Sequence, residues 1–428
     1  MNPFDKLIRI LGLILCLIIC QINVINCKQY VPMQRAYHTA TFVGDKIYFL
    51  GGFTESLNYT NDFFTLDVSK SFNQSEGLPF EDLSYLSSSV PEHNRATTSV
   101  GGQLKDTIFL FDGHMGNYTN YASEVVQSFS TSEKIWQSVT INSGVEPLRR
   151  TSMNAATDNN GKVFLFGGAK ELDPIQYYNI MNTFDTINKV WNSMSTFETP
   201  RDGYTATYIP ESNIIIYIGG FGGFGKYNYP YSSPNLLDIS NLDIYDTINN
   251  YWREQPTQNP PQSRVFHTAV LTNDSRIIVF GGADNTTSHP VNSHYEVLDV
   301  NTYQWYHGTD DVNIVAPFRG HTATLVGDYM FIAFGIVYTK DGNFPSNKII
   351  IYKIGNYANF QEVDSFITQS IADTDNSNSK NTNTNIKFNT VQIIAIAVGT
   401  SGIVIIAIAV FIIYKKYPKK KENILFIE

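Results

Sequence analysis

The chain has only three cysteines among 428 residues, and all three lie near its N-terminus, at Cys16, Cys20 and Cys27. Too few cysteines remain to cross-link the rest, which excludes a small domain stapled by disulfides. Charged residues make up 16% of the chain and the formal net charge is −9, so there is no basic face for nucleic acid. The fold must therefore rest on a large apolar core, and 14% aromatic residues suit a core rich in β-structure.

The N-terminal segment has the order of residues that is typical of a secretory signal peptide. Lys6 and Arg9 precede an apolar run over 10–20, and a short polar stretch then leads to Cys27. We predict a signal peptide over 1–27, cleaved near Cys27. An uncleaved signal anchor is the alternative, which the shortness of the apolar run disfavours.

A second apolar run, over 391–414, contains no charged residue. At about 1.5 Å per residue its length matches a hydrocarbon core of about 30 Å, which predicts a transmembrane helix rather than a buried core helix. Lysines follow at once, so the positive-inside tendency predicts that 415–428 is a cytoplasmic tail. The stretch 367–390 is dominated by Asn, Ser, Thr and Asp and is predicted to be a flexible stalk.

One short apolar stretch recurs six times along the chain. The copies are KIYFLGG (46–52), TIFLFDG (107–113), KVFLFGG (162–168), IIIYIGG (214–220), RIIVFGG (276–282) and the more degenerate YMFIAFG (329–335). Each copy predicts a buried strand that ends where positive φ or a close backbone approach requires glycine. Recurrence at a regular spacing predicts a repeat architecture.

Each copy sits in a longer frame that starts with an arginine: Arg35, Arg95, Arg150, Arg201, Arg264 and Arg319. After the glycines come a variable loop, an apolar run, an acidic turn and an aromatic residue. All four tryptophans of the chain occupy this last position: Trp136, Trp191, Trp252 and Trp305. We expect Phe72 and Phe360 to replace the tryptophan in the first and last copies. A large ring at this point predicts packing between neighbouring sheets.

This frame resembles the kelch repeat, in which a Gly-Gly pair after the second strand is joined to a spaced Tyr or Asp and a Trp. The resemblance implies an all-β fold: a six-bladed kelch β-propeller over 28–366, with blades that start near 35, 95, 150, 201, 264 and 319. The second copy departs from the pattern at Asp112-Gly113, and the sixth has Gly335-Ile336 and no tryptophan. Either 29–33 or 360–366 is expected to supply the last outer strand of the ring.

Kelch propellers are similar to the propeller of galactose oxidase, so the alternative function is an extracellular enzyme of that kind. That resemblance implies a copper held by two histidines and two tyrosines, one of them cross-linked to a cysteine, and the chain beyond 27 has no cysteine. His38, His267 and His321 share one repeat position, which favours a structural role over a three-histidine metal site. No serine-hydrolase elbow or phosphate loop occurs. We therefore predict no catalytic residue, no metal and no cofactor.

Recognition of a protein or glycan is the function that the sequence favours. In kelch proteins the loops between blades, and those between second and third strands, line one face of the ring. The six arginines are expected near that face, where they either offer donors to carboxylate or sulfate ligands or tie the blades together. Two loops add tyrosines that either contact a ligand or pack on their own blades: Tyr177, Tyr178, Tyr227, Tyr229 and Tyr231.

The sequence as a whole predicts a single-pass type I protein of the plasma membrane, with the propeller outside the cell. Its expected partner is an extracellular protein or glycan, in adhesion or sensing, and neither nucleic acid nor a small-molecule cofactor is expected. Five sequons are candidate glycosylation sites: Asn58, Asn73, Asn117, Asn273 and Asn285. Glycans there would leave the third and fourth copies as the barer sector.

Overall fold

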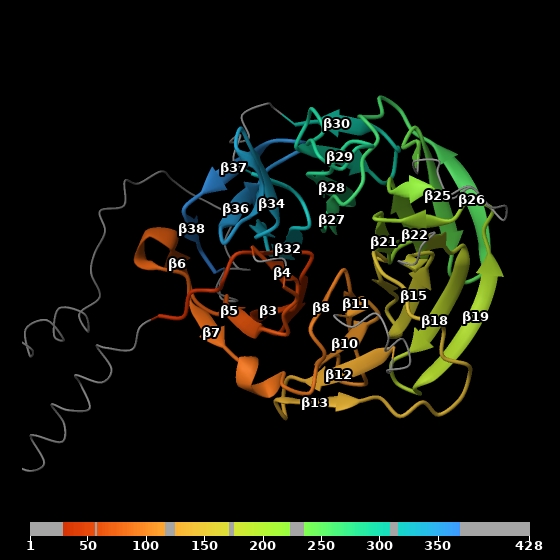
Figure 1. Ribbon diagram of the computed structural model, residues 1–428. Helices are drawn as coiled ribbons and strands as arrows, with labels where there is room; N and C mark the ends of the chain where they lie inside the picture. The colour runs from red at the N-terminus through yellow and green to blue at the C-terminus, as the bar shows by residue number, and fades with distance from the viewer. Residues whose placement is uncertain are drawn as a thin grey trace, which may run out of the picture. The chain divides into compact units, whose positions relative to one another are not determined.

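The computed structural model describes residues 29–55, 58–115, 125–170, 175–222, 235–308 and 316–368 (Figure 1). The predicted signal peptide, transmembrane helix and cytoplasmic tail lie outside these residues, as does the stalk beyond 368. Within the described ranges, no helix is both long enough and apolar enough to cross a bilayer.

The described strands form six antiparallel sheets of four strands, each built from a continuous stretch of chain and numbered here as blades 1 to 6. Blade 1 is β2 (Thr39–Val43), β3 (Lys46–Leu50), β5 (Phe63–Asp67) and β7 (Phe80–Asp82), and blade 2 is β9 (Thr97–Gly101), β10 (Thr107–Phe111), β12 (Val126–Ser130) and β13 (Ile135–Ser138). Blade 3 is β14 (Ala156–Thr157), β15 (Lys162–Phe166), β18 (Ile180–Asp185) and β19 (Val190–Thr196), and blade 4 is β21 (Thr205–Ile209), β22 (Ile214–Ile218), β25 (Asn241–Asp246) and β26 (Tyr251–Pro256). Blade 5 is β27 (Thr268–Leu271), β28 (Arg276–Phe280), β29 (Tyr295–Asp299) and β30 (Trp305–His307), and blade 6 is β32 (Thr322–Val326), β33 (Tyr329–Ala333), β36 (Ile349–Ile354) and β37 (Phe360–Val363).

The first strands of the six blades contact one another in a closed circle. β2 contacts β9 and β32, β14 contacts β9 and β21, and β27 contacts β21 and β32. Figure 1 views this ring along its axis, with the outer strands at the rim. The prediction of an all-β propeller is confirmed.

Short strands form a second layer on one side of the ring, which is called the loop face below. They lie just before a first strand or between a second and a third strand, so they extend the loops rather than the blades. The pairs and triplets are β1 (Arg35–Ala36) with β4 (Phe53–Thr54), β8 (His93–Asn94) with β11 (His114–Met115), β16 (Ala169–Lys170) with β17 (Gln176–Tyr177), β20 (Arg201–Asp202) with β23 (Phe221–Gly222) and β24 (Asn235–Leu236), and β31 (Pro317–Arg319) with β34 (Ile336–Thr339) and β35 (Gly342–Pro345).

The apolar core lies in the gaps between blades, one cluster of buried side chains to a gap. Trp136, Trp191 and Trp305 are at most 6% exposed and fill three of these gaps, while Trp252 is half-buried in a fourth. The prediction that the tryptophans pack between sheets is therefore confirmed. Because a twisted four-stranded sheet buries neither face alone, these gaps supply most of the apolar burial.

The expectation for Phe72 was wrong. Phe80 on β7 pairs with Leu66, the position that faces a tryptophan in blades 2 to 5, whereas Phe72 lies outside the blade on β6 (Phe72–Asn73). Phe360 lies in the last outer strand but pairs with Ile354, while Glu362 faces Tyr352 at the tryptophan position, so this expectation was wrong as well. The Phe360 ring packs 4.9 Å from that of Tyr295 in the gap between blades 5 and 6.

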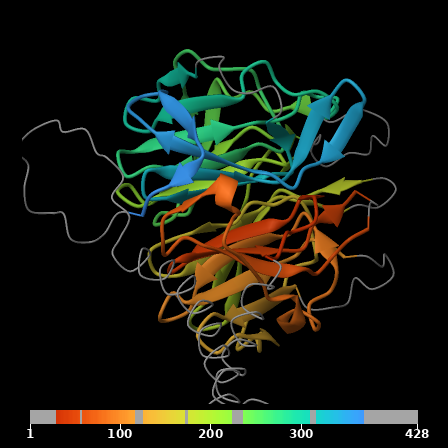
Figure 2. The same ribbon diagram turned by 90° about the vertical axis from the view of Figure 1, so that its left-hand side faces the viewer.

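Blade 6 closes on blade 1 without exchanging a strand. Of the two segments expected to supply the last outer strand, 360–366 provides it as β37, and β38 (Ser365–Phe366) then pairs with β6 next to blade 1. Two short 3-10 helices, η1 (Gln74–Glu76) and η2 (Ser84–Leu86), flank β7. Figure 2 shows the first and last blades, orange and blue, side by side, and one apolar cluster joins them.

Candidate ligand-binding face

A turn residue with positive φ precedes the first strand of every blade. These six residues are called the axial ring: Tyr37, Arg95, Ser152, Gly203, Phe266 and Gly320, with φ between 52° and 65°. Five of them donate their backbone N–H to the backbone carbonyl of the axial-ring residue in the preceding blade, over 2.7 to 3.0 Å. The ring is held by backbone alone, so its side chains vary without breaking it.

The axial ring shows that the six predicted arginines are not equivalent. In each blade the last residue of the glycine pair donates its N–H to a carbonyl of the next blade, and those carbonyls belong to His93, Arg150, Arg201, Arg264, Phe318 and Arg35. In blade 2 the accepting carbonyl belongs to His93, so Arg95 lies two residues after it, in the axial ring itself. In blade 6 it belongs to Phe318, so Arg319 lies one residue after it. The sequence carried the signal, because Arg35 is three residues before His38 but Arg319 only two before His321.

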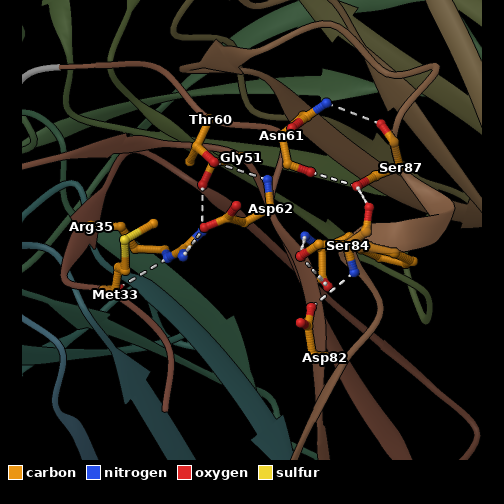
Figure 3. Close-up of polar contacts among 10 residues, drawn as sticks. Met33, Arg35, Gly51, Thr60, Asn61, Asp62, Asp82, Ser84 and Ser87 are labelled. Carbon is orange, nitrogen blue, oxygen red and sulfur yellow. Dashed lines mark hydrogen bonds and ion pairs between the residues drawn. The ribbon is translucent and has the colours of Figure 1, made fainter. Parts of the chain in front are cut away.

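Four arginines are buried and serve their own blades, so for these four the contacts favour a structural role over the predicted ligand binding. Each is at most 3% exposed and donates to the carbonyl of the first glycine of its pair. Arg35, Arg150 and Arg201 also donate to a carboxylate or amide near the third strand, whereas Arg264 forms an ion pair with Glu296 at 3.6 Å. For Arg35 the partners are Gly51 at 3.1 Å and Asp62 at 2.9 Å (Figure 3). The other sets are Arg150 with Gly167 and Asn182, Arg201 with Gly219 and Asp243, and Arg264 with Gly281 and Glu296. These contacts link the start of each blade to its own second and third strands, so the side chains hold a blade together internally rather than tying neighbouring blades.

The remaining two arginines lie at the centre of the loop face. The Arg95 guanidinium lies 5.0 Å from the centroid of the Tyr37 ring and 5.7 Å from that of Phe266. Those two rings meet edge to face at 5.6 Å, and Arg319 Nη1 approaches the Tyr37 hydroxyl at 3.4 Å. Arg95 and Phe266 come from blades 2 and 5, opposite each other in the circle, so these side chains meet on the axis. Tyr37, Arg95, Phe266 and Arg319 are called the axial cluster.

Two glycines of the axial ring make room for the cluster. A Cβ at Gly203 would lie 2.8 Å from a ring carbon of Phe266, and one at Gly320 would lie 3.0 Å from two ring carbons of Tyr37. Positive φ suits glycine, but here the close approach of an aromatic ring is the stronger requirement.

A channel of about 210 Å³ lies along the axis, lined by residues of all six blades. His38, His267 and His321 are buried in its wall, and each Nε2 lies 3.0 Å from a threonine hydroxyl of the preceding blade. Burial lowers the pKa of all three, that of His321 to about 3, because desolvation disfavours the imidazolium. These contacts favour the structural role, and in the described ranges no three His, Cys, Asp or Glu side chains are grouped as metal ligands.

The predicted tyrosines fall in two groups. Tyr177 lies on β17 and Tyr178 follows it, with its ring 5.7 Å from the Arg150 guanidinium, and burial raises the pKa of Tyr178. Neither belongs to the axial cluster. Tyr227, Tyr229 and Tyr231 lie outside the described residues.

Three of the predicted glycosylation sites, Asn58, Asn273 and Asn285, have exposed side chains. Asn73 is different, because its Nδ2 donates to Ser365 Oγ at 2.7 Å and its Oδ1 accepts from the Ser75 N–H at 2.8 Å. Asn117 lies outside the described residues.

Comparison with known proteins agrees with this geometry. Residues 94–335, over half of the chain, match the KLHDC2/KLHL20/DRC7 Kelch-repeats domain. Kelch domain-containing protein 3 of Rattus norvegicus is 25% identical over 318 residues, which cover 69% of this chain and 76% of that protein. The Bos taurus protein of that name is 26% identical over 258 residues, which cover 58% of this chain and 64%, under two thirds, of its own length.

A solved structure of YjhT has the same fold, with a TM-score of 0.56 over 77% of this chain and 98% of that one. At 13% identity this similarity concerns the fold alone. With the matched domain, the glycine pairs and the blade-gap tryptophans together, the chain belongs to the kelch-repeat family.

Proposed function

We propose that this protein recognises an acidic protein segment or an acidic glycan at the loop face, without catalysis. The observation that carries the proposal is the axial cluster, which holds two guanidinium groups against aromatic rings at the centre of that face. A guanidinium offers planar, paired donors that match carboxylate and sulfate. The four buried arginines donate to carbonyls of their own blades, whereas Arg95 and Arg319 lie at the centre of the loop face, so recognition is assigned to Arg95 and Arg319.

The proposal includes the cellular placement expected from the sequence. A cleaved signal, a stalk, one transmembrane helix and a basic tail would present the propeller outside the cell as a type I protein of the plasma membrane, active in adhesion or sensing. Exposed sequons at Asn58, Asn273 and Asn285 support an extracellular, glycosylated propeller.

The test uses cells that display the full chain, probed with labelled acidic glycans and with acidic and neutral protein segments. The variant R95Q/R319Q removes both axial guanidiniums. Each charge-assisted hydrogen bond contributes about 1.5–3 kcal/mol, so affinity for the acidic probes should fall at least about tenfold. The matched control K105Q/K134Q loses the same charge from exposed turns at the other ends of blade 2's strands.

Equal binding by R95Q/R319Q and the wild type would overturn the site. Equal binding of neutral and acidic probes would overturn the ligand class. Stoichiometric copper in the purified protein would instead favour the galactose-oxidase-like alternative.

A further inference from the structure

Return segments, which lead from an outer strand back to the axis, run along the edge of the following blade in two places. Before blade 3, Ser143 accepts from the Trp191 N–H at 3.1 Å and the Asn142 N–H donates to Lys189 at 2.9 Å. Before blade 5, Gln258 accepts from the Trp305 N–H and donates to Tyr303, both at 2.9 Å. Both segments lie parallel to the outer strand that they cover.

Among the residues that the structure describes, no return segment pairs with β26, the outer strand of blade 4. Ten positions separate Trp191 from Arg201, against fourteen between Trp136 and Arg150, so the return segment before blade 4 is shorter. The turn before β26 is built as in its neighbours, since the Asn250 N–H donates to Asp246 at 2.9 Å, as the Lys189 N–H does to Asp185 at 2.8 Å.

By this equivalence the Trp252 N–H and the Asn250 carbonyl point outward from β26. No residue of the described ranges forms a hydrogen bond with either group, although the equivalent groups of blades 3 and 5 are bonded. An outer strand with unpaired N–H and C=O groups is a template for another strand.

The uncovered edge borders a groove of about 580 Å³ between the end of β19 and β26, called the edge groove. Phe197, Glu198 and Thr199 line one side, and residues 250–254 line the other. The Trp252 ring stacks on that of Phe197 at 4.6 Å and is the one repeat tryptophan that is only half-buried. Figure 1 shows β19 and β26 at the rim, away from the first strands that surround the axis.

The charges of the edge groove select its occupant. Asp243 is paired with Arg201, and the remaining charges of the lining are the carboxylates of Glu198 and Glu254 and the guanidinium of Arg253. Arg253 donates to Gln255 and Tyr303, and Glu254 accepts from Asn241. The excess of negative charge suits a lysine or arginine. The occupant must also donate a backbone N–H to the Asn250 carbonyl. In the neighbouring blades Asn142 and Gln258 donate in the same way to Lys189 and Tyr303. Proline cannot stand at the donating position, because it has no backbone N–H.

We propose that the edge groove binds an extended basic segment of a partner protein, which pairs in parallel with β26 and has no proline at the pairing residue. The segment takes the place that residues 142–143 and 258 occupy in the neighbouring blades. This site is separate from the axial cluster, and its partner contributes backbone as well as charge.

Hydrogen exchange of the full-length protein tests the open edge. The Trp252 amide should exchange at least about a hundredfold faster than the Trp191 and Trp305 amides, which are bonded to return segments. Equal protection of the three amides would overturn the proposal.

Binding is measured by fluorescence anisotropy with a labelled peptide that copies residues 140–144 and carries a lysine at each end. Its matched control bears a methyl group on the backbone nitrogen of the asparagine that corresponds to Asn142. The methylated peptide should bind at least about tenfold more weakly, because it cannot donate to Asn250. The unmodified peptide should protect the Trp252 amide.

Two variants complete the test. E198K should weaken binding at least about fivefold through like-charge repulsion, whereas E133K, an equal change on an exposed turn of blade 2, and R95Q/R319Q should not weaken it. Absent binding, equal binding of the two peptides, or an unprotected Trp252 amide would each overturn the proposal. Sedimentation that shows a dimer dissolved by E254P would assign the edge to a second copy of the chain and overturn the foreign occupant.

Discussion

Replacing Arg264 with methionine tests whether the buried arginines hold the blades. Arg264 is 0% exposed, and its guanidinium donates to Gly281 at 2.9 Å and to Ser293 at 3.1 Å. It also lies 3.6 Å from Glu296, which is itself 1% exposed and bonded to His307 at 2.7 Å. R264M keeps a shorter, unbranched apolar side chain in place of the arginine stem but removes every one of these donors.

The expected loss follows from what the substitution leaves behind. Breaking a buried ion pair by removing one partner costs about 3–5 kcal/mol, because the remaining charge stays buried. The two stranded carbonyls add to this cost, while the thioether restores part of the packing. We therefore expect the free energy of unfolding to fall by about 3–5 kcal/mol. In R264M/E296L the stranded carboxylate is gone, so at least about half of the loss should be recovered.

Urea unfolding followed by tryptophan fluorescence measures this loss. The control is K46M, which removes an ion pair between Lys46 and Glu81 whose side chains are 27% and 46% exposed and should cost less than about 1 kcal/mol. If R264M cost no more than K46M, the structural role of the buried arginines would be refuted. Arg264 would then return to the candidates for ligand binding.

Three further predictions concern other parts of the fold. Burial raises the pKa of Asp112 to about 7, so its contribution to stability is present at low pH and lost as pH rises through 7. In D112N, the free energy of unfolding should therefore fall less between pH 5 and 8 than in the wild type. An equal fall in both proteins, measured by denaturation at each pH, would contradict this. G320A should lower the free energy of unfolding by about 1–3 kcal/mol more than G327A, because both have positive φ but only the first new Cβ meets the tyrosine of the axial cluster; equal losses by urea unfolding would remove the packing argument. In secreted protein, glycopeptide mass spectrometry should find Asn73 less occupied than the exposed sequons, because its amide is bonded to Ser365, and full occupancy there would contradict this.

The blades could be predicted from sequence because their signal is local and repeated. A strand such as 162–166 carries its own apolar pattern, and the tryptophan follows an acidic turn at a fixed spacing. That spacing has a structural cause: Asp185 Oδ1 accepts N–H groups from Ile187 and Asn188, which fixes the turn before Trp191. Phe72 was chosen wrongly because an aromatic residue alone does not define the register, and Phe80 is set by its pairing with Leu66.

The candidate sites were harder to predict because they depend on contacts between blades. The number of residues from each arginine to the next glycine placed Arg95 and Arg319 with the other four arginines. The backbone hydrogen bonds between blades show that Arg95 lies two positions, and Arg319 one position, beyond the place that the other four occupy. The axial cluster joins residues that are far apart in sequence, and the edge groove arises from a segment that is too short to cover β26. Neither a motif nor a composition marks such features in a single copy of the repeat.

The location of both proposed sites follows from what the scaffold requires of each position. At the axial ring the scaffold requires positive φ and backbone bonds, so tyrosine, arginine, serine and phenylalanine occupy equivalent places beside two glycines. At the return segments it requires only a connection, so their length varies and, within the described ranges, the edge of β26 is left uncovered. Inside the blades, by contrast, Arg264 and Glu296 each need the other, and neither can change alone without leaving a buried charge. Recognition in this propeller is therefore expected where backbone, rather than side chains, maintains the fold.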